Sequence, residues 1–367
     1  MASTLLSPGV EIQERDLAIG SIETVEVNVG AIAGAFSKGP VLKPVRIANE
    51  SQLIEVFGEP TDGNATTWWT AASFLQYGGV LDVVRVSTSG QLTASDDNVT
   101  SPYTLSIPTV EVYEATYAGA SNNPWKWAAR TPGADANAIK VAIIDKGADI
   151  TLSLDGALTT STVGTQVQTA SGSPNGAKSG FIYEWDSVNN KVSLITSDTW
   201  TTTDVIENGV TDLNVTAKSD WYDSQVAYGN VNWNSIAPRP GTSPYVSTRG
   251  GANDEMHVIV YDATGVITGT PNTLLEKFTY VSKANNAKTA SGAVNYYPTV
   301  IQDKSSYVYW GSHENDAYDV SANAAITSGA NFGGTNNKGS DSTTTFDLFS
   351  SDSANRSYTF VKGAETL

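Results

Sequence analysis

Hydrophobic positions between residues 24 and 34 recur with the period of a β-strand. The run TVEVNV at 24–29 alternates polar and apolar residues, which places its three valines on one face. The following GAIAGAF continues the run with small residues. Gly30 and Gly34 leave room for a neighbouring backbone. The pattern predicts a strand that another element approaches closely.

A short helix is predicted after residue 49. Asn49 suits the N-cap, and Gln52 three residues later completes a capping-box pattern. Three apolar side chains, Leu53, Ile54 and Phe57, would face inward. Gly58 and Pro60 then provide a stop signal.

A second helix is predicted in the stretch NATTWWTAASFLQYGG. Trp68, Ala71, Ala72 and Leu75 recur at i, i+3, i+4 and i+7, and Gly78 suits a left-handed C-terminal cap. The Trp-Trp pair at this spacing is more typical of a core than of a sugar-stacking surface. The apolar run VLDVVRV at 80–86 then predicts a buried strand, so residues 24–87 form a strand-helix-helix-strand unit.

Short alternating runs bounded by turn residues dominate the chain from about 91 to 250, and they predict antiparallel β-structure. Further along, HVIVYDATGVITG at 257–269 predicts two strands joined by an Asp-Ala-Thr-Gly turn. The next run, NTLLEKFTYVS, fits either a strand or a helix. Long loops are expected from 311 to 357, followed by a last strand at 357–363. The runs that predict β-structure in the first of these regions are YTLSIP, IKVAIID, ITLSL, FIYEW and KVSLIT.

The elements together predict an α+β multidomain protein that is β-rich. We expect an extended N-terminal arm at 1–22 and a small α/β domain at 23–94 that residues 355–367 complete. A β-rich variable surface region at 95–250 and a second β-containing domain with Ser/Asn/Gly-rich loops at 251–354 would form one large insertion.

Composition narrows the possible functions of the 367-residue chain. Its 40% hydrophobic content suffices for two or three domain cores. No window reaches eighteen uninterrupted apolar residues, so direct membrane insertion is not expected. Cysteine is absent, which excludes disulfides and thiolate chemistry. The 38 acidic and 21 basic residues give a dispersed net charge of -17 without a basic stripe, so no nucleic-acid partner is expected.

Candidate chemistry is sparse. The two histidines, His257 and His313, are far apart in sequence, and His313 with Glu314 and Asp316 is only a weak metal pattern. No Gly-x-Ser-x-Gly elbow occurs, and no Gly-Lys-Ser/Thr follows the glycines near residue 30 as a phosphate loop requires. The sequence therefore predicts no catalytic, cofactor-binding or metal site, and a protein that is not an enzyme.

Several of these motifs resemble the tail sheath proteins of contractile-tailed bacteriophages. LLSPGVEIQERD, GAIAGAFSKGP, ESQLIEVFGEP and FLQYGGVLDVVRV follow in the order and spacing of that family. RTPGADANAIKVAII and HVIVYDATGVITG also resemble it, whereas residues 146–250 carry no matching motif. Because sheath proteins continue into a tube-facing core domain, we expect this sequence to be the outer, N-terminal portion of a longer subunit.

The resemblance implies that the N-terminal arm exchanges a strand with neighbouring subunits. Pro8-Gly9 keeps the alternating Val-Glu-Ile-Gln run that follows from joining a longer helix or strand of its own subunit, and such a segment can add to another sheet. Gly20 is the candidate hinge between arm and domain. The residues expected to form the subunit-interaction arm are Leu5, Leu6, Pro8, Gly9, Val10 and Ile12.

The implied function is a sheath subunit that polymerises helically around a tail tube and contracts during genome delivery. The implied partners are further copies of the chain, the tail tube protein, and baseplate and tail terminator proteins. The implied location is the virion tail, with assembly in the host cytoplasm. A related injection machine, such as a bacteriocin or secretion system, fits the same motifs.

Two other functions remain open from the sequence. A phage or cell-surface adhesin could bind glycans through Trp185, Trp200, Trp221 and Trp233 of the β-rich region. A secreted hydrolase would need His257 or His313 at its active site, and it would leave the arm unexplained.

Overall fold

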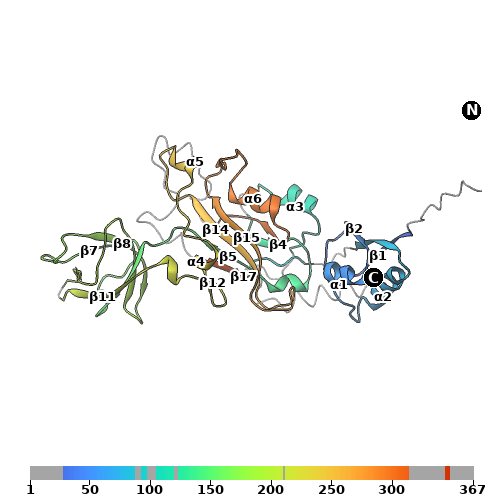
Figure 1. Cartoon of the computed structure of the whole chain (residues 1–367), viewed down its shortest axis with the longest axis horizontal. Coiled ribbons are helices and arrows are strands. Elements are labelled where there is room, and N and C mark those ends of the chain that lie inside the picture. Colours follow the sequence, from blue (N-terminus) through green and yellow to red (C-terminus); the bar gives the residue numbers. More distant parts are fainter. Residues whose placement is uncertain are drawn as a thin grey trace, which may run out of the picture.

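The computed structural model of the chain describes residues 28–86, 92–96, 105–119, 123–209 and 211–313, and the backbone of 344–347. These residues form three units in a row (Figure 1), which we call the N-terminal unit (28–86), the central unit (mainly 105–149 and 226–313) and the distal unit (150–220). Several predicted features lie outside the described residues: Leu5, Leu6, Pro8, Gly9, Val10, Ile12, the hinge Gly20 and the strand at 357–363.

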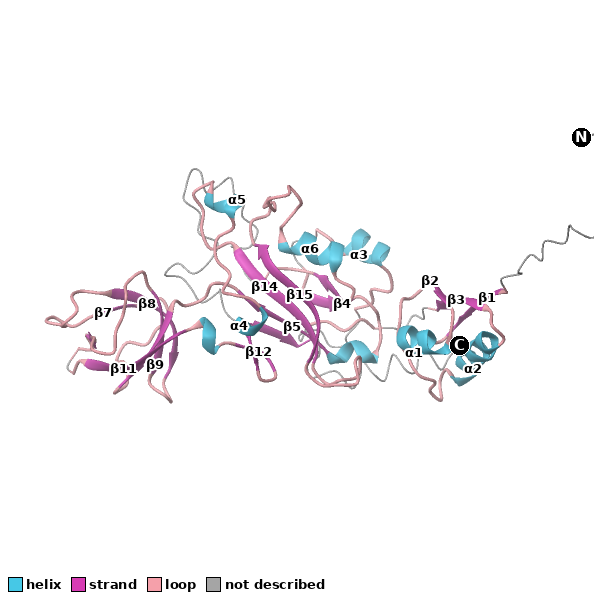
Figure 2. Cartoon of the chain, viewed as in Figure 1, coloured by secondary structure: helices cyan, strands magenta, loops and turns pink. Residues whose placement is uncertain are grey.

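The N-terminal unit is a three-stranded sheet with two helices on one side (Figure 2). The strands lie in the order β1-β3-β2, with β1 parallel to β3 and β2 antiparallel to it. Strand β2 was not predicted, because its four residues PVRI are too short to show a period. The elements are β1 (Val29–Gly34), β2 (Pro44–Ile47), α1 (Glu50–Phe57), α2 (Ala65–Gln76) and β3 (Val80–Arg85).

Helix α1 begins and ends at the predicted residues. The backbone N–H of Gln52 donates to Asn49 Oδ1 at 2.9 Å, and the Gln52 side chain accepts from the Ala48 N–H at 2.9 Å. Gly58 follows with a φ of 82°, and its N–H donates to the Ile54 carbonyl. The predicted N-cap Asn49 is confirmed, whereas Gln52 closes the capping box one residue early, on the N–H of Ala48 and not on that of Asn49.

Helix α2 buries the predicted face. Trp68, Ala71, Ala72 and Leu75 are buried against the sheet. Trp68 Nε1 donates to the Gly58 carbonyl at 2.8 Å, which joins α2 to the end of α1. These contacts confirm the helical period read from the sequence.

The two glycines of β1 allow α2 to lie directly on the sheet. A Cβ atom on Gly30 would lie 2.6 Å from the Phe74 ring, and one on Gly34 would lie 2.3 Å from Thr67 Cγ2. Neither distance is compatible with a side chain larger than hydrogen. A close approach at these glycines was predicted, but the nearest atoms belong to side chains of α2 and not to a neighbouring backbone.

The central unit combines strands from distant parts of the chain. Its four-stranded antiparallel sheet has the order β15-β14-β5-β17, and β16 pairs with β4 nearby. The strands are β4 (Trp127–Ala129), β5 (Ile139–Ile144), β14 (Glu255–Asp262), β15 (Thr273–Ser282), β16 (Val308–Trp310) and β17 (Thr344–Asp347). The domain boundary predicted near residue 250 is wrong. Strand β5 pairs with β14 and strand β4 pairs with β16, and both of these partners lie after residue 250.

Short helices and a small hairpin surround the central sheet. They are α3 (Val110–Thr116), η1 (Ala134–Ala138), η2 (Tyr222–Ser224), β12 (Val226–Tyr228), β13 (Val231–Asn232), α4 (Trp233–Ile236), α5 (Pro244–Ser247) and α6 (Tyr297–Lys304). None of the helices formed by the described residues combines the length and apolar character needed to cross a membrane.

Two strand predictions in the central unit are wrong. The second half of 257–269 is a loop, because the Asp262 carboxylate accepts hydrogen bonds from the backbone N–H groups of Gly265, Ile267 and Thr268. These bonds satisfy donors that a strand would offer to a neighbour. The described part of YTLSIP, residues 105–108, is not a strand either, since Pro108 lacks an N–H and Thr109 caps α3. The ambiguous run at 273–282 is a strand, β15.

The distal unit confirms the predicted antiparallel structure. Its six strands lie in the order β10-β11-β6-β9-β8-β7. Their inner faces form a core that includes Leu152, Val192, Leu194 and Trp200. The strands are β6 (Ile150–Leu154), β7 (Gln166–Gln168), β8 (Ser179–Asp186), β9 (Lys191–Ile195), β10 (Val205–Ile206) and β11 (Leu213–Asp220).

Candidate interaction surface

His257 has a structural place in the central sheet. It is buried in β14, where Nδ1 accepts a hydrogen bond from the Tyr280 backbone N–H at 3.0 Å. Its Nε2 lies 2.8 Å from the Pro238 carbonyl, so the neutral ring that accepts at Nδ1 donates at Nε2. Burial lowers the pKa of His257 below its ordinary value. Both ring nitrogens are therefore engaged with the backbone.

His313 is bonded to two tyrosines. Its Nε2 lies 3.1 Å from the Tyr296 hydroxyl, and its Nδ1 lies 2.7 Å from the Tyr297 hydroxyl. Glu314 and Asp316, which complete the weak metal pattern, lie outside the described residues. Within the ranges that the structure describes, no three His, Asp or Glu side chains are grouped so that they could hold a metal ion.

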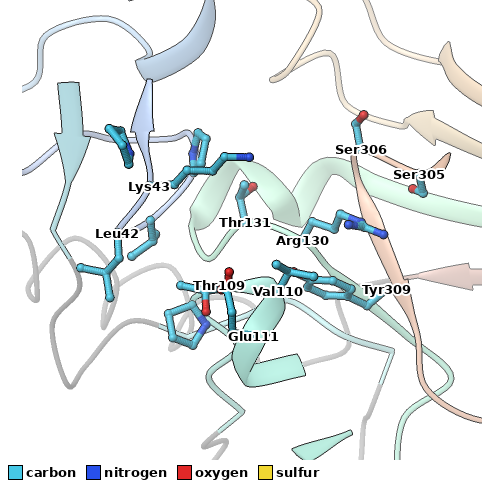
Figure 3. Close-up of a pocket in the computed structure, with 14 residues that line it drawn as sticks. Leu42, Lys43, Thr109, Val110, Glu111, Arg130, Thr131, Ser305, Ser306 and Tyr309 are labelled. Atoms are coloured by element: carbon cyan, nitrogen blue, oxygen red, sulfur yellow. The ribbon is translucent and has the colours of Figure 1, made fainter. Parts of the chain in front are cut away.

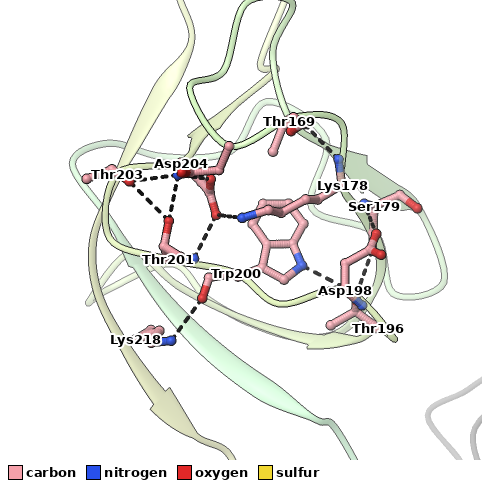
Figure 4. Close-up of polar contacts among 12 residues, drawn as sticks. Thr169, Lys178, Ser179, Thr196, Asp198, Trp200, Thr201, Thr203, Asp204 and Lys218 are labelled. Carbon is pink, nitrogen blue, oxygen red and sulfur yellow. Dashed lines mark hydrogen bonds and ion pairs between the residues drawn. The ribbon is translucent and has the colours of Figure 1, made fainter.

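The tryptophans of the β-rich region do not form a stacking platform. Trp200, Trp221 and Trp233 are at most 2% exposed, and Trp185 is half-buried. Figure 4 shows the indole of Trp200 beneath Lys178, with its Nε1 directed to Thr196. A glycan-binding surface needs exposed ring faces, so these four residues give no support to the adhesin.

A polar network fixes the loop above Trp200 (Figure 4). The buried Asp204 carboxylate accepts from Lys178 Nζ at 2.6 Å, from the Thr201 N–H at 2.7 Å and from the Asn175 amide at 2.9 Å. Burial alone would raise the pKa of Asp204, but the hydrogen bonds from Lys178, Asn175 and Thr201 together lower it. The network stabilises the distal unit and offers no free catalytic group.

The N-terminal unit has an exposed sheet face that could contact another chain. Among the described residues, no helix covers one face of its sheet, and Val29, Ala31 and Ala33 of β1 are exposed there. On the same face, Arg46 of β2 forms a two-pronged ion pair with Asp82 of β3, at 2.9 and 3.0 Å. The hydrogen bond from Arg46 lowers the pKa of Asp82. Apart from this ion pair, the described residues of the face are mostly apolar.

Strand β1 lies at an edge of that sheet. In the part of the chain that the structure describes, β3 is its one paired neighbour. An edge strand presents backbone donors and acceptors to which another strand can add. The segment predicted to be the arm, residues 1–22, precedes this strand in the sequence.

Arg85 joins the N-terminal unit to the central unit. Its guanidinium is buried and donates to the carbonyls of Gly39 and Pro132 at 2.9 Å each, and to that of Ser37 at 3.3 Å. Burial lowers the pKa of Arg85 to about 10, and the nearby Asp135 partly offsets this effect. Arg85 was not predicted as a functional residue, since one arginine in the apolar run VLDVVRV matches no known motif.

A cleft of about 670 Å³ lies beside this junction (Figure 3). Leu42 and Lys43 of the N-terminal unit lie on one side, and Arg130 and Tyr309 of the central unit lie on the other. Arg130 Nε donates to the Val308 carbonyl at 3.2 Å, and the guanidinium lies 4.7 Å from the centre of the Tyr309 ring. Arg130 is already engaged by the Val308 carbonyl and the Tyr309 ring. We therefore interpret the cleft as a gap between the two units and not as a ligand site.

Comparison with known proteins agrees with this geometry. Residues 29–86, the N-terminal unit, match the family model described as the tail sheath protein Gp18 domain III N-terminal region. The chain is similar to phage tail sheath proteins. The matched residues span β1 to β3 and include both helices. The resemblance seen in the sequence motifs is thereby confirmed.

Individual tail sheath proteins extend the similarity. That of Vibrio phage KVP40 is 40% identical over 83 residues, and that of Enterobacteria phage T4 is 39% identical over 82. These matches cover 23% and 22% of this chain, and 12% of each relative. The tail sheath protein of Salmonella phage ViI is 27% identical over 333 residues, which cover 83% of this chain and 49% of the relative. The chain thus spans about half the length of that sheath protein.

Proposed function

We propose that this chain is a structural subunit of a contractile tail sheath. In this function it polymerises helically around the tail tube and contracts to drive the tube through the host envelope during genome delivery. The observation that carries the proposal is the match of the N-terminal unit to a sheath family model, within a chain that aligns over 83% of its length with one tail sheath protein.

The arm at 1–22 is the proposed link between subunits. Val10 and Ile12 alternate with polar residues and would add as a strand to a sheet of the next copy. Burial of two or three aliphatic side chains contributes about 1.5 to 3 kcal/mol each, and each backbone hydrogen bond about 1 kcal/mol, before ordering costs. Because the contact is head to tail, it extends into a helical array.

Contraction is proposed to change the lattice while each subunit keeps its fold. The arms would keep neighbours connected as rigid units rotate, with Gly20 as the candidate hinge. The Arg85 hydrogen bonds support this view, since they hold the N-terminal and central units together. Differences in contact free energy between the two lattices would drive the change without a nucleotide.

The proposal assigns partners and places as well as a mechanism. The expected partners are further copies of the chain, the tail tube protein, the baseplate and the tail terminator. The subunit would assemble in the host cytoplasm and act in the virion tail. The arm at 1–22 and the completion of the sheath domain at 23–94 by residues 355–367 are part of the same proposal. The predicted regions 95–250 and 251–354 are not separate in the fold, since both contribute strands to the central unit.

Electron microscopy of the purified full-length subunit at rising concentration tests the function. We expect striated tubes from the unaltered subunit. A chain that lacks residues 1–16 should keep its circular dichroism spectrum and form none, because the described fold begins at residue 28. Tubes of normal length from the truncated chain would contradict the function assigned to the arm.

A matched pair of variants separates the arm's apolar face from its charge. Val10→Asp combined with Ile12→Asp should abolish tubes, since both side chains would be buried in the added strand. Glu11→Ser combined with Gln13→Ser changes the opposite face and should leave tube formation intact. Equal loss in both pairs would show that the arm does not bind as a strand with one buried face.

A further inference from the structure

Helix α2 has an outer face without charge. Residues 63–81 contain no Asp, Glu, Lys or Arg, although 16% of the whole chain is charged. The shorter helix α1 carries Glu50 and Glu55. An exposed helix normally presents charged residues to water, so α2 departs from the usual pattern for a solvated surface.

The same face exposes two aromatic side chains. Trp69 is 53% exposed and Tyr77 is 87% exposed, while the adjacent Trp68 is buried. The Trp69 ring packs edge-on against Trp68, with ring centres 4.9 Å apart, so a rigid support holds it in place. The exposed Ser73 lies between Trp69 and Tyr77 on the helix surface. We call the exposed residues Thr66, Trp69, Thr70, Ser73 and Tyr77 the α2 face.

Exposed aromatics are concentrated here. Trp69 and Tyr77 are the two aromatic members among the large hydrophobic side chains that are exposed in the described ranges. The other members are Val29, Leu42, Val163, Val188, Val226, Val266 and Val294. Aromatic residues are enriched and charged residues depleted at the centres of protein interfaces. The α2 face has this composition.

The C-terminal end of α2 lies near the start of β1. The Val80 N–H donates to the Asn28 carbonyl at 2.9 Å, and Val29 pairs with Val80 just after helix α2 ends. Tyr77 therefore lies at the same end of the unit as Val29. Because Gly30 and Gly34 face α2, the side chain of Val29 lies on the opposite face of the sheet, and the α2 face is a separate surface of the unit.

Charge identifies the kind of partner. Each copy of the chain has a net charge of -17, and two copies repel wherever acidic surfaces approach. An uncharged face is the place where identical copies can meet with the smallest electrostatic cost. Trp69 and Tyr77 supply apolar area there, and the hydroxyls of Thr66, Thr70 and Ser73 supply polar contacts.

We propose that the α2 face is a contact surface for a second copy of this chain. The inference rests on the proposed sheath function and adds to it a second contact besides the arm. The surface around Trp69 and Tyr77 of one subunit would lie against a different surface of its neighbour, as a head-to-tail lattice requires.

Photo-crosslinking tests this contact directly. Because the chain has no cysteine, Trp69→Cys and Tyr77→Cys each provide one thiol for benzophenone maleimide. Illumination under tube-forming conditions should convert both labelled chains to a covalent dimer. Val188→Cys is the matched control, since Val188 is 88% exposed in the turn between β8 and β9, and it should give little dimer.

Peptide mapping of the products decides between the possible occupants. Crosslinks from positions 69 and 77 to one region of another copy would support the proposal. Crosslinks within the same chain, or a dimer yield no greater than that of the Val188 control, would overturn it. A Val10→Cys chain labelled in parallel reports the arm, so dimers from position 10 alone would refute the α2 contact while the sheath function stands.

Charge substitutions give a second readout on the unlabelled chain. Tyr77→Lys should raise the concentration at which tubes appear by about tenfold or more, as expected for a residue near an interface centre. Val188→Lys should not. Tyr77 lies at the C-terminal cap of α2 and is almost fully exposed, so its replacement leaves the fold intact. An unchanged threshold for Tyr77→Lys would contradict the proposal.

Discussion

The imidazole of His257 accepts a hydrogen bond from the backbone N–H of Tyr280 at 3.0 Å, across the β14–β15 pair. Tyr280 has a φ of 56° at an interruption of that pairing opposite Met256 and Val258. A bulge leaves ladder donors without their regular partners. His257 supplies the acceptor that the neighbouring strand cannot.

Protonation of His257 should therefore weaken the central sheet. Because burial lowers the pKa of His257 in the folded chain, the unfolded chain binds more protons just below the ordinary value of 6.5. The contribution of His257 to the free energy of unfolding is fully present above pH 6.5. It decreases as the pH falls towards the lower pKa of the folded chain. Urea unfolding from pH 7.5 to 5.0 should show a smaller difference between the unaltered chain and His257→Gln at the acid end.

Glu255 is the relevant competing group, two residues before His257. Burial raises its pKa, so its own contribution has the opposite dependence on pH. Glu255→Gln removes this contribution and should leave the difference due to His257 unchanged. A difference that is constant over the whole pH range would show that Tyr280 does not depend on the neutral ring.

Arg85 should be important to the junction of the N-terminal and central units. Arg85→Met removes donors from the carbonyls of Gly39 and Pro132 and should cost roughly 3 kcal/mol in the free energy of unfolding. Arg85→Lys should recover only part of the lost stability, since one ammonium group cannot replace the several N–H donors of the guanidinium. A protease in limited amount should cut the Arg85→Met chain between residues 86 and 105 faster than it cuts the unaltered chain.

Arg46 is the control for this experiment. It lies on β2 and its ion pair with Asp82 is solvent-exposed. Arg46→Met should change neither the unfolding curve nor the cleavage rate appreciably, because exposed pairs contribute little. Equal effects of the two substitutions would contradict a special function for the buried arginine.

Gly34 should not tolerate even a methyl group. The Cβ of Gly34→Ala would lie 2.3 Å from Thr67 Cγ2, so the Thr67 side chain or helix α2 must shift, at about 2 kcal/mol. Thr67→Ala removes that methyl group. The double variant should recover most of the lost stability in thermal unfolding, and an additive loss in the two variants would disprove the steric contact.

Lys283 and Asp145 form a buried ion pair at 2.8 Å, with 0% and 2% of their side chains exposed. Asp145→Asn should destabilise the central unit by about 3 kcal/mol, since it removes the charge that compensates a buried ammonium. Replacing both residues, with Asp145→Leu and Lys283→Met, should cost less than the sum of the single changes. A double-mutant cycle by urea unfolding measures this coupling.

The sequence was sufficient for elements whose signals are local. Helix α1 was predictable because Asn49 and Gln52 cap it, and α2 because its buried residues keep the helical period. Local patterns could not show that β5 pairs with β14, since more than a hundred residues separate them. They also could not show that Asp262 binds the following backbone and prevents a strand at 266–269.

The interaction surface was only partly predictable. Periodicity placed Trp68 in the core, but it does not show what the exposed Trp69 contacts. Arg85 was overlooked because a single arginine in an apolar strand has no motif, and its acceptor Pro132 belongs to another unit. The arm residues Leu5, Leu6, Val10 and Ile12 remain predictions, since they lie outside the described part of the chain.

The parallel pairing of β1 with β3 determines how a mechanical load would cross the subunit. A pull on the arm enters at Val29, and the resisting connection to the central unit is at Arg85, at the opposite end of the two strands. The strands are then loaded in shear, so that all the hydrogen bonds between residues 29–34 and 80–85 share the force instead of opening one by one. The N-terminal unit is therefore arranged to resist a pull along its strands.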